Sequence, residues 1–350
     1  MDAVPIPDAY PPDRKRKKKA VTTSFLKTQP APRFSFHDLG PDSGSFLEDV
    51  IRGLARGRKE LPPKYFYDER GCALFDAICE LPEYYPTRTE IGMMQARAAE
   101  MARHLGPGCV LIEYGSGSGR KTRLLLEKLR PIAYVPVDIA CTQLRDSAGR
   151  VAREFPDLAV IAVCADYSRP LALPGLEGIA ARRRVVYFPG STIGNFTPGE
   201  AVRFLGNARA LTGEGGGLLI GVDLKKDPSR LHAAYNDAQG VTAEFNLNLL
   251  TRINRELGAN FDLSAFRHQA FYNAELGRIE MHLSCVRGQR VDIAGNRFDF
   301  RAGDTVHTEN SYKYTVAEFQ EVGRSAGFVP LECWTDPDLL FSVHYMTVSN

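Results

Sequence analysis

The sequence lacks the features that mark membrane and secreted proteins. None of its apolar runs approaches the roughly 20 residues that a membrane-spanning helix needs, and no secretory signal precedes the first segment with a helical pattern. The 44 lysines and arginines nearly balance the 42 acidic residues, and a net charge of +2 does not indicate nucleic-acid binding. We therefore expect a cytoplasmic protein with neither a nucleic acid nor a membrane as its partner.

Paired cysteine motifs are also missing. The seven cysteines are scattered, no two of them form a Cys-x-x-Cys pair, and none stands in a metal-like cluster with histidine. Such a distribution favours reduced, mostly buried thiols in a cytosol. The sequence therefore predicts no metal site.

Two common nucleotide-binding motifs are absent from the glycine-rich stretch at 113–122, EYGSGSGRKT. A P-loop needs the pattern GxxxxGK[ST] and a dehydrogenase turn needs GxGxxG, whereas here Gly115, Gly117 and Gly119 alternate with serines. An apolar run precedes this stretch and an apolar helical pattern follows it, which predicts a strand, a tight turn and a helix. Because glycine adopts backbone angles closed to other residues, a nucleotide-like ligand can lie against this turn, beside the positive end of the helix.

Acidic residues end the next two predicted strands. The run Ala133–Val137 ends in Asp138, 23 residues beyond Gly115, close to the roughly 20 expected of a carboxylate that binds ribose hydroxyls. The run Leu158–Val163 is followed by Asp166–Tyr167, an acid and an aromatic that could hold an adenine amino group and ring. Either acid alone could be a turn or cap residue, but that explanation is poor for both together.

A fourth predicted strand, Arg184–Phe188, leads into the segment Ser191–Asn195. Ligands of open α/β sheets bind at the carboxyl ends of the strands, so this segment should face the same crevice as the glycine turn. The Asn195 amide offers an acceptor and two donors, enough to hold the amino and carboxylate groups of an amino acid. The alternative is that Asn195 caps the helix that begins near Pro198.

Acid, glycine turn and second acid, in this order, resemble the adenosylmethionine site of class I methyltransferases. Longer strings resemble one family of that class, the histidine Nα-methyltransferases of ergothioneine biosynthesis. The resemblance runs from about Phe34 to the C-terminus. The strings that carry it are YFYDERGCALFDAICELPEYYPTRTE (65–90), EYGSGSGRKT (113–122), GSTIGNF (190–196), AYNDAQGVTAEFNLNLLTRINRELGANFD (234–262), RIEM (278–281) and HTENSYKY (307–314).

The resemblance implies an α/β fold, with a Rossmann-like class I methyltransferase sheet and a second, smaller α+β substrate domain. It implies S-adenosyl-L-methionine as the cofactor and L-histidine as the substrate, with trimethylhistidine (hercynine) as the product. The residues that it places on the cofactor are Gly115, Gly117, Lys121, Asp138, Asp166 and Tyr167. Those that it places on the amino acid are Tyr85, Asn195, Tyr235, Met281, Glu309 and Ser311, with Asn195 and Tyr67 closest to the reacting nitrogen.

Two of these assignments have plainer alternatives. Among the four tyrosines between positions 65 and 85, we expect Tyr65 and Tyr84 to be core residues, and only the resemblance gives Tyr67 and Tyr85 a substrate role. A carboxylate at Glu309 and a hydroxyl at Ser311 could read both edges of an imidazole, but the same polar residues would also suit a solvated strand edge.

The chain is expected to divide into three parts and to act as a monomer. Residues 1–33 are rich in proline, lysine and arginine and should form a disordered basic tail. Residues 34–225 and 312–350 should form the methyltransferase core, and residues 226–311 the substrate-binding lid domain. We expect a helical pattern from Phe34 to Glu90, one long helical region from Leu231 to Leu257, and one strand from Phe271 to Val286.

Methyl transfer from a sulfonium to an amine is an in-line displacement in which positioning is the main catalytic device. Two departures from the family pattern, Tyr114 in place of a leucine and Asn310 in place of an apolar residue, leave room for another aromatic amino acid as the substrate. A catalytically silent cofactor-binding module and a nucleic-acid methyltransferase are the alternatives from other classes.

Overall fold

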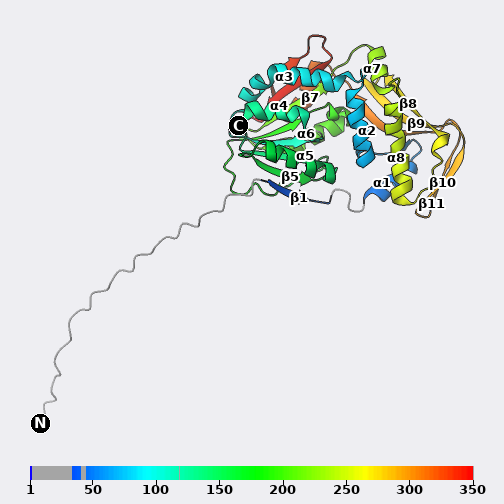
Figure 1. Cartoon of the computed structure of the whole chain (residues 1–350), viewed down its shortest axis with the longest axis horizontal. Coiled ribbons are helices and arrows are strands. Elements are labelled where there is room, and N and C mark those ends of the chain that lie inside the picture. Colours follow the sequence, from blue (N-terminus) through cyan, green and yellow to red (C-terminus); the bar gives the residue numbers. More distant parts are fainter. Residues whose placement is uncertain (2–33, 41–44, 118, 350) are drawn as a thin grey trace. The chain divides into compact units, whose positions relative to one another are not determined.

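An eight-stranded sheet carries the predicted glycine turn at the end of one of its middle strands (Figure 1). The computed structural model describes residues 1, 34–40, 45–117 and 119–349, so the predicted tail lies outside the described residues apart from its first residue. The strand order is β1-β5-β4-β3-β6-β7-β14-β13. The parallel strands are β1 (Phe34–Asp38), β3 (Val110–Tyr114), β4 (Ala133–Asp138), β5 (Ala159–Cys164), β6 (Arg184–Phe188) and β7 (Gly217–Asp223).

Two antiparallel strands, β13 (Val329–Thr335) and β14 (Phe341–Thr347), complete this sheet next to β7. The short apolar runs predicted to be strands are therefore present, and the predicted α/β class is confirmed. The parallel strands are buried on both faces, which explains why they appear in the sequence as nearly continuous apolar runs.

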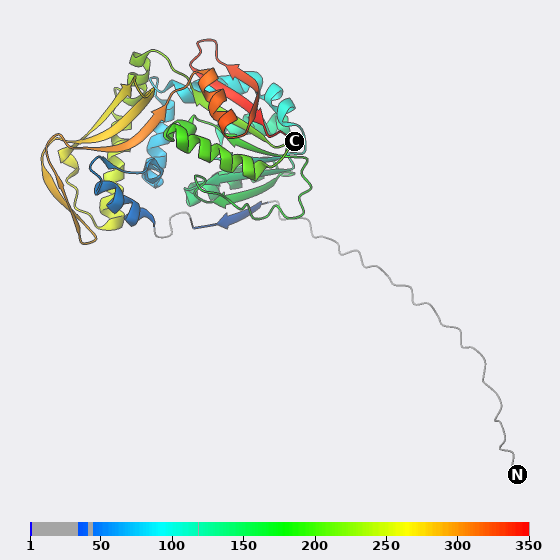
Figure 2. The ribbon, with the colours of Figure 1, turned by 180° about the vertical axis from the view of Figure 1, so that it is seen from behind.

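Helices cover both faces of the large sheet. Apolar side chains of α3 (Tyr85–Leu105), α4 (Arg120–Leu129) and α5 (Cys141–Glu154) pack on one face. Those of α6 (Pro198–Thr212) and α9 (Val316–Ser325) pack on the other, which is turned toward the viewer in Figure 2. None of the described helices is both long and apolar enough to cross a membrane.

The first strand corrects one prediction. We expected a helical pattern from Phe34 onward, but Phe34–Asp38 forms β1, which pairs in parallel with β5 at the edge of the sheet. Phe34 and Phe36 alternate with Ser35 and His37, a period of two that belongs to a strand. Five residues are too few for a helical period to be distinguished from this alternation.

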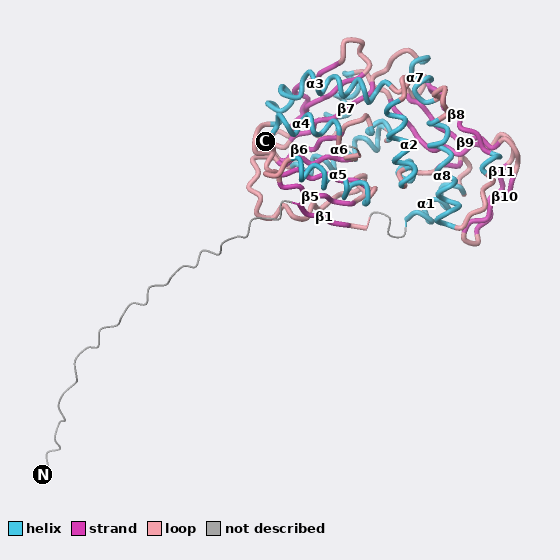
Figure 3. The backbone as a smooth tube through the Cα atoms, in the orientation of Figure 1, coloured by secondary structure: helices cyan, strands magenta, loops and turns pink. Residues whose placement is uncertain are grey.

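A second, four-stranded sheet has the order β2-β12-β9-β8. Its strands are β2 (Lys59–Glu60), β8 (Phe266–Asn273), β9 (Arg278–Cys285) and β12 (Thr305–Tyr312), and a separate hairpin joins β10 (Gln289–Ile293) to β11 (Asn296–Phe300). The helical segments beside it are α1 (Ser45–Leu54), η1 (Pro63–Phe66), α2 (Glu69–Glu80), α7 (Pro228–Tyr235), α8 (Val241–Leu257) and η3 (Leu263–Ala265). Figure 3 shows α2 and α8 next to one another on the side of β8 and β9.

One apolar core joins the two chain segments of this second sheet. It combines buried residues from positions 46–85 with others from positions 231–306. We therefore call residues 45–84 and 228–312 the small-sheet region, and the rest of the described chain from residue 34 the large-sheet region. The sequence pattern places residues 45–84 in the methyltransferase core instead, and the proposed domain boundaries remain a prediction.

Two predicted elements of the small-sheet region are divided in the structure. The expected helix at 231–257 breaks into α7 and α8. Gly240, the N-cap of α8, has a φ of 75°, and the Asp237 carboxylate accepts from the backbone N–H groups of Val241 and Thr242, both at 2.8 Å. The expected strand at 271–286 is the β8–β9 hairpin, which turns at Gly277, where φ is +66°.

Candidate active site

The glycine turn has the backbone geometry that its sequence predicts. Gly115, Gly117 and Gly119 all have positive φ values, of 69°, 44° and 69°. They join the end of β3 to the start of α4, where Gly119 stands as the N-cap. Because this left-handed backbone strains any residue with a side chain, the three positions favour glycine and leave the turn open toward a ligand.

A cleft, here called the cofactor cleft, opens at this turn. Its lining combines the carboxyl ends of the large-sheet strands with side chains of the small-sheet region. The lining residues are Tyr67, Cys72, Phe75, Asp76, Ala77, Cys79, Glu80, Tyr84, Thr87, Ile91, Glu113, Gly115, Ser116, Gly117, Gly119, Arg120, Lys121, Thr122, Asp138, Ile139, Gln143, Tyr167, Pro189, Gly190 and Thr192. Six predicted site residues therefore share one cleft: Tyr67, Gly115, Gly117, Lys121, Asp138 and Tyr167.

Asp138 is held against the glycine turn. Its Oδ2 accepts from the Gly117 N–H at 3.3 Å and its Oδ1 from the Ala140 N–H at 3.1 Å. Burial raises the pKa of this carboxyl group, and the backbone N–H donors oppose that rise by stabilising the charged form. The chain therefore presents a fixed carboxylate at the end of β4, suited to accept hydrogen bonds from a ligand's hydroxyl groups.

Tyr167 supplies an aromatic face in the same cleft. Its ring stacks on Tyr114 with 5.4 Å between centroids and 9° between planes. Asp166 is placed differently, because its Oδ1 accepts from the Ser168 hydroxyl at 2.5 Å and its Oδ2 lies 3.3 Å from the Lys64 Nζ. It does not line the cofactor cleft, so its expected contact with the cofactor stays a prediction.

Two acids that were not among the predicted site residues support the cleft. Glu90 is fully buried on α3, and its Oε2 accepts from the Lys121 Nζ at 2.6 Å and from the Gly190 N–H at 2.9 Å. Its Oε1 has no hydrogen-bond partner within the described part of the chain. Glu113 accepts from the Thr122 hydroxyl at 2.5 Å, and burial raises its pKa to about 7.

A sequence signal existed for only one of these acids. Glu113 directly precedes the glycine turn, whereas Glu90 lies 100 residues before Gly190, and no local pattern connects the two. The ion pair of Glu90 with Lys121 ties α3 to the first turn of α4, so both acids act on the shape of the cofactor cleft.

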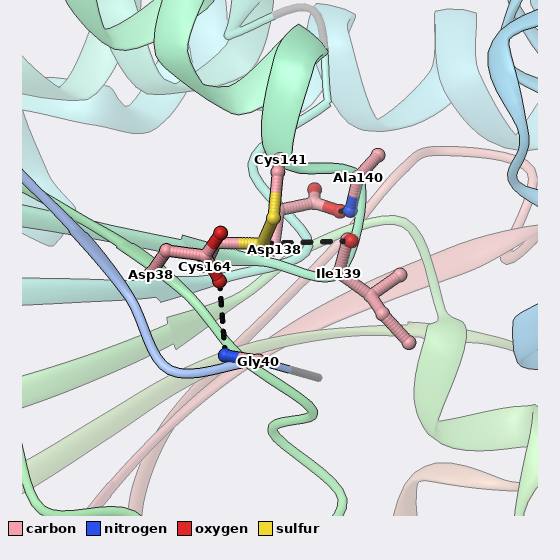
Figure 4. Close-up of a disulfide and its surroundings, with 7 residues drawn as sticks. All are labelled: Asp38, Gly40, Asp138, Ile139, Ala140, Cys141 and Cys164. Carbon is pink, nitrogen blue, oxygen red and sulfur yellow. Dashed lines mark hydrogen bonds between the residues drawn. A yellow bond between two sulfur atoms is a disulfide. The ribbon is translucent and has the colours of Figure 1, made fainter. Parts of the chain in front are cut away.

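The cysteines depart from the expectation of seven reduced thiols. Cys141 and Cys164 form a disulfide, with 5.2 Å between their Cα atoms, and the other five cysteines are free (Figure 4). Cys164 pairs with Asp138 at the ends of β5 and β4, and Cys141 begins α5 only three residues after Asp138. Their separation of 23 residues matches no cysteine motif, so only the adjacency of the two strands brings them together.

The residues predicted to hold the substrate side chain, together called the Glu309 pocket, lie on the small sheet. Glu309 and Ser311 are two residues apart on β12, so their side chains share one face. Met281 stands opposite Glu309 on β9, which brings its side chain to the same face. Burial raises the pKa of Glu309 to about 7, and the Lys313 cation opposes this rise. At neutral pH the pocket therefore holds a carboxyl group that is partly ionised.

Three tyrosines stand around Glu309. Burial, followed by the Glu309 charge, raises the pKa of Tyr67. Burial, and after it the charges of Tyr235, Cys79 and Glu309, raise the pKa of Tyr84. Burial and the Glu309 charge also raise the pKa of Tyr235. The rings of Tyr84 and Tyr235 lie 6.3 Å apart. Because Tyr67 and Tyr84 also line the cofactor cleft, these two residues connect it to the Glu309 pocket.

The neighbouring tyrosines 84 and 85 have different surroundings in the structure. Tyr85 is 2% exposed and belongs to the core of the small-sheet region, and its hydroxyl lies 2.8 Å from Asp223 Oδ2 and 2.6 Å from the Lys226 Nζ. Tyr84, which we expected in the core, packs against that core and also lines the cofactor cleft. Since successive residues at the start of a helix point in different directions, a tyrosine pair leaves the choice between them open in the sequence.

Asn195 ends η2 (Thr192–Asn195), which packs closely against β12. The contact depends on Gly194, because a Cβ there would lie 2.8 Å from the Tyr312 carbonyl oxygen and 3.1 Å from the Tyr312 nitrogen. Asn195 is therefore brought beside the strand that carries Ser311. Its side chain does not line the cofactor cleft, and its contact with the reacting amino group stays a prediction.

One histidine-containing cluster was not foreseen. Ligand-type atoms of Glu280, His282 and His307 lie within 4.8 Å of one another. The three residues come from the paired strands β9 and β12, so neither strand's sequence alone contains the pattern. Glu280 already accepts from Arg278 at 2.7 Å and has the His282 Nε2 at 3.0 Å, so its charge is paired within the protein.

The chain has close relatives among known proteins. A family model described as "Histidine-specific methyltransferase, SAM-dependent" matches residues 46–348. The histidine N-alpha-methyltransferase of Mycolicibacterium smegmatis is 43% identical over 299 residues, which cover 83% of this chain and 90% of the relative. That of Mycobacterium tuberculosis is 42% identical over 306 residues, 85% and 94% of the two chains.

A fungal relative matches over part of its length. The ergothioneine biosynthesis protein 1 of Neurospora crassa is 32% identical over 299 residues, which cover 80% of this chain and 32% of that protein. The family match spans both the large-sheet and the small-sheet regions. The cofactor cleft and the Glu309 pocket therefore lie within a single matched segment.

Proposed function

Because this chain belongs to the family of histidine-specific, SAM-dependent methyltransferases, we propose that it methylates the α-amino nitrogen of L-histidine. Its cofactor is S-adenosylmethionine. The observation that supports histidine as the substrate is that the Glu309 carboxyl group and the Ser311 hydroxyl lie on the same face of β12. The two similar mycobacterial enzymes, both named histidine N-alpha-methyltransferase, support the same choice.

The cofactor cleft has groups that fit adenosylmethionine. When bound, the cofactor supplies an electrophilic methyl group on a sulfonium. The open turn at Gly115 and Gly117 admits a ligand against the backbone, the Asp138 carboxylate accepts hydrogen bonds from ribose hydroxyls, and Tyr167 offers an aromatic ring. Lys121 keeps the start of α4 in place through its ion pair with Glu90.

The Glu309 pocket has the chemistry that an imidazole requires. A neutral imidazole carries one N–H donor and one nitrogen acceptor. Glu309 accepts from the N–H, Ser311 donates to the second nitrogen, and Met281 supplies an apolar wall. An aromatic hydrocarbon ring in the same place would leave both polar groups unpaired, which disfavours it.

The remaining groups orient the reacting amine. An α-amino group has a pKa of about 8, so a neutral fraction exists near pH 7, and an acceptor beside it need only direct its lone pair. We assign this role to Asn195 and Tyr67, and the holding of the amino-acid backbone to Tyr84 and Tyr235. Because Tyr235 donates its proton to Ser311, its hydroxyl can only accept a hydrogen bond from the substrate. Tyr84 replaces Tyr85 in this assignment because Tyr85 uses its hydroxyl on Asp223 and Lys226.

We further propose that three methyl groups are added, which gives trimethylhistidine for ergothioneine biosynthesis. Under this proposal the enzyme acts as a monomer in the cytoplasm on a free amino acid, without a nucleic-acid or membrane partner. Repeated methylation requires that the mono- and dimethylated amines stay neutral long enough to react and still fit beside Tyr67.

A mass-spectrometric screen tests the proposal. The purified full chain is incubated with adenosylmethionine and each of the twenty amino acids, and products are identified by mass and fragmentation. We expect methyl groups on the α-nitrogen of histidine, in three steps. Methylation of another amino acid in preference to histidine, or a product methylated on the ring, would contradict the assignment of substrate or of the reacting nitrogen.

A further inference from the structure

Lys313 lies just beyond β12, two residues after Ser311, and is 2% exposed. Its ammonium group has three protons and no lone pair, so it can only donate. Its Nζ lies 2.7 Å from Asp223 Oδ2, 2.8 Å from the Ser311 Oγ and 3.2 Å from the Tyr235 hydroxyl oxygen. These three acceptors use all three protons.

The Ser311 hydroxyl thereby loses its freedom to act as an acceptor. A hydroxyl has one proton and two lone pairs. The Ser311 Oγ receives one hydrogen bond from Lys313 at 2.8 Å and a second from the Tyr235 hydroxyl at 2.7 Å. Since both lone pairs are occupied, the hydroxyl proton of Ser311 has to be donated to a third group.

We propose that Lys313 is a specificity-determining residue, which fixes Ser311 as a hydrogen-bond donor toward the substrate side chain. The pocket then offers one acceptor, Glu309, and one donor, Ser311. A neutral imidazole matches this pair, with its N–H and its unprotonated nitrogen. This inference rests on the proposed function, in which Glu309 and Ser311 hold the side chain of the amino acid.

A buried acid keeps Lys313 charged, and therefore keeps it a donor. Asp223 is 1% exposed and lies 2.5 Å from the Lys226 Nζ and 2.7 Å from the Lys313 Nζ. Burial alone lowers the pKa of Lys313, but the adjacent Asp223 carboxylate outweighs it and raises the pKa above its usual value. The ammonium form is retained across the whole physiological range of pH.

The donor assignment can be tested with substrate analogues. The two β-pyrrolylalanines keep one ring N–H, at one or the other nitrogen position of histidine, and replace the second nitrogen by C–H. In the native enzyme this C–H faces the proton of Ser311, which is left without an acceptor. We therefore expect kcat/KM for histidine to exceed that for the better pyrrolylalanine by about 10-fold or more.

The variant Lys313→Met removes the donor and keeps the chain length. Ser311 can then turn its proton away from the substrate, so the ratio of kcat/KM, histidine over pyrrolylalanine, should fall by about 5-fold. Lys313→Met leaves Asp223 paired with Lys226, and Asp223→Asn combined with Lys313→Met serves as a second variant, in which Ser311 likewise has no charged donor. Adenosylmethionine binding, measured by calorimetry, reports that each variant is folded.

Three further variants separate this role from a structural one. Ser311→Ala should lower the same ratio by a similar factor, and adding Lys313→Met to it should lower the ratio no further. Lys226→Met takes a cation from Asp223 without touching Ser311 and should leave the ratio unchanged. Lys225→Met, an exposed neighbour paired with Glu318, should change neither the ratio nor the activity.

An unchanged ratio in Lys313→Met and in the double variant with Asp223→Asn, with an equal loss of activity toward every amino acid, would overturn the inference. So would a native enzyme that uses pyrrolylalanine as well as histidine. Failure of the native enzyme to methylate histidine at all is a different result, which would reject the proposed function itself.

Discussion

The large-sheet and small-sheet regions build their parts of the site in different ways. The large-sheet region forms the cofactor cleft mainly from backbone, with three left-handed glycines in five residues and a carboxylate at the end of the next strand. The small-sheet region forms the Glu309 pocket from side chains far apart in the chain, namely Tyr67 and Tyr84, Tyr235 on α7, and Glu309 on β12. Backbone geometry leaves a local sequence pattern, whereas convergent side chains leave none.

The cofactor cleft and the Glu309 pocket also differ in how they hold charge. Asp138 in the cofactor cleft is stabilised by backbone N–H groups, so its environment depends on the turn. Next to Ser311 of the Glu309 pocket, Lys313 and Lys226 both form buried ion pairs with Asp223. Substitutions in the cofactor cleft should therefore act on cofactor binding, and substitutions in the Glu309 pocket on the choice of amino acid.

The largest expected effect is on stability, and it lies in the large-sheet region alone. The disulfide of Cys141 and Cys164 closes a loop of 23 residues, so Cys141→Ser should lower the free energy of unfolding by about 3 kcal/mol. Denaturant titration without reductant measures it, with Cys333→Ser, which alters a free thiol, as the control. The disulfide would be contradicted if Cys141→Ser and the native chain were equally stable and mass spectrometry found seven free thiols in the native chain.

The second prediction concerns cofactor affinity. Asp138→Ala should weaken adenosylmethionine binding by about 1.5–3 kcal/mol, the scale of hydrogen bonds to a charged group. The preference among amino acids should stay as it is, because Asp138 belongs to the large-sheet region. Calorimetry gives the affinity, and Asp146→Ala, on the helix that follows, is a matched control. Unchanged affinity in Asp138→Ala would reject its role as the ribose acceptor.

The third prediction is a pH dependence confined to the small-sheet region. Burial raises the pKa of Glu309 to about 7, so the carboxylate acceptor is present above this value and is lost below it. One pH unit below the pKa about a tenth of the groups are ionised, so KM for histidine should rise up to about 10-fold between pH 8 and pH 6.

Glu309→Gln isolates this titration, because an amide does not ionise in this range. The part of the rise in KM that comes from Glu309 should be absent from the variant, while the effects of imidazole and α-amino protonation of the substrate remain in both proteins. The same KM profile in the native enzyme and in Glu309→Gln would show that another group causes the pH dependence.

The smallest expected effect separates two adjacent tyrosines. Tyr84→Phe should raise KM for histidine by about 2- to 10-fold, the scale of one lost hydrogen bond. Tyr85→Phe should instead lower the stability, because its hydroxyl pairs with buried Asp223, and should change KM less. Steady-state kinetics and thermal melting of both variants make the comparison. A larger KM effect in Tyr85→Phe would return the substrate contact to that residue.

Individual elements show how far the sequence predicts the structure. Strand β6 runs over Arg184–Phe188, as expected, because a parallel strand buried on both faces is a short, nearly unbroken apolar run. The split of the helix at 231–257 differs from the prediction, because it depends on Asp237 and on the left-handed Gly240, two residues inside an otherwise helical pattern.

The same contrast holds within the site. The cleft positions of Gly115 and Asp138 follow from local spacing, whereas the disulfide, Glu90 and the choice between Tyr84 and Tyr85 follow only from the packing of distant segments. Lys313 stands in an ordinary polar stretch, and its role depends on Asp223, 90 residues earlier in the chain. Long-range charge pairs of this kind leave no mark on a single sequence.

The most direct test of the substrate assignment is the ratio of kcat/KM, histidine over tryptophan, in the native enzyme and in Glu309→Ala. Loss of the carboxylate should cost histidine about 1.5–3 kcal/mol, or roughly 10- to 150-fold, and adenosylmethionine affinity should barely change. The ratio should fall, because an uncharged pocket no longer sets an unpaired acid against an apolar ring. An equal ratio in both proteins would contradict the claim that Glu309 selects histidine.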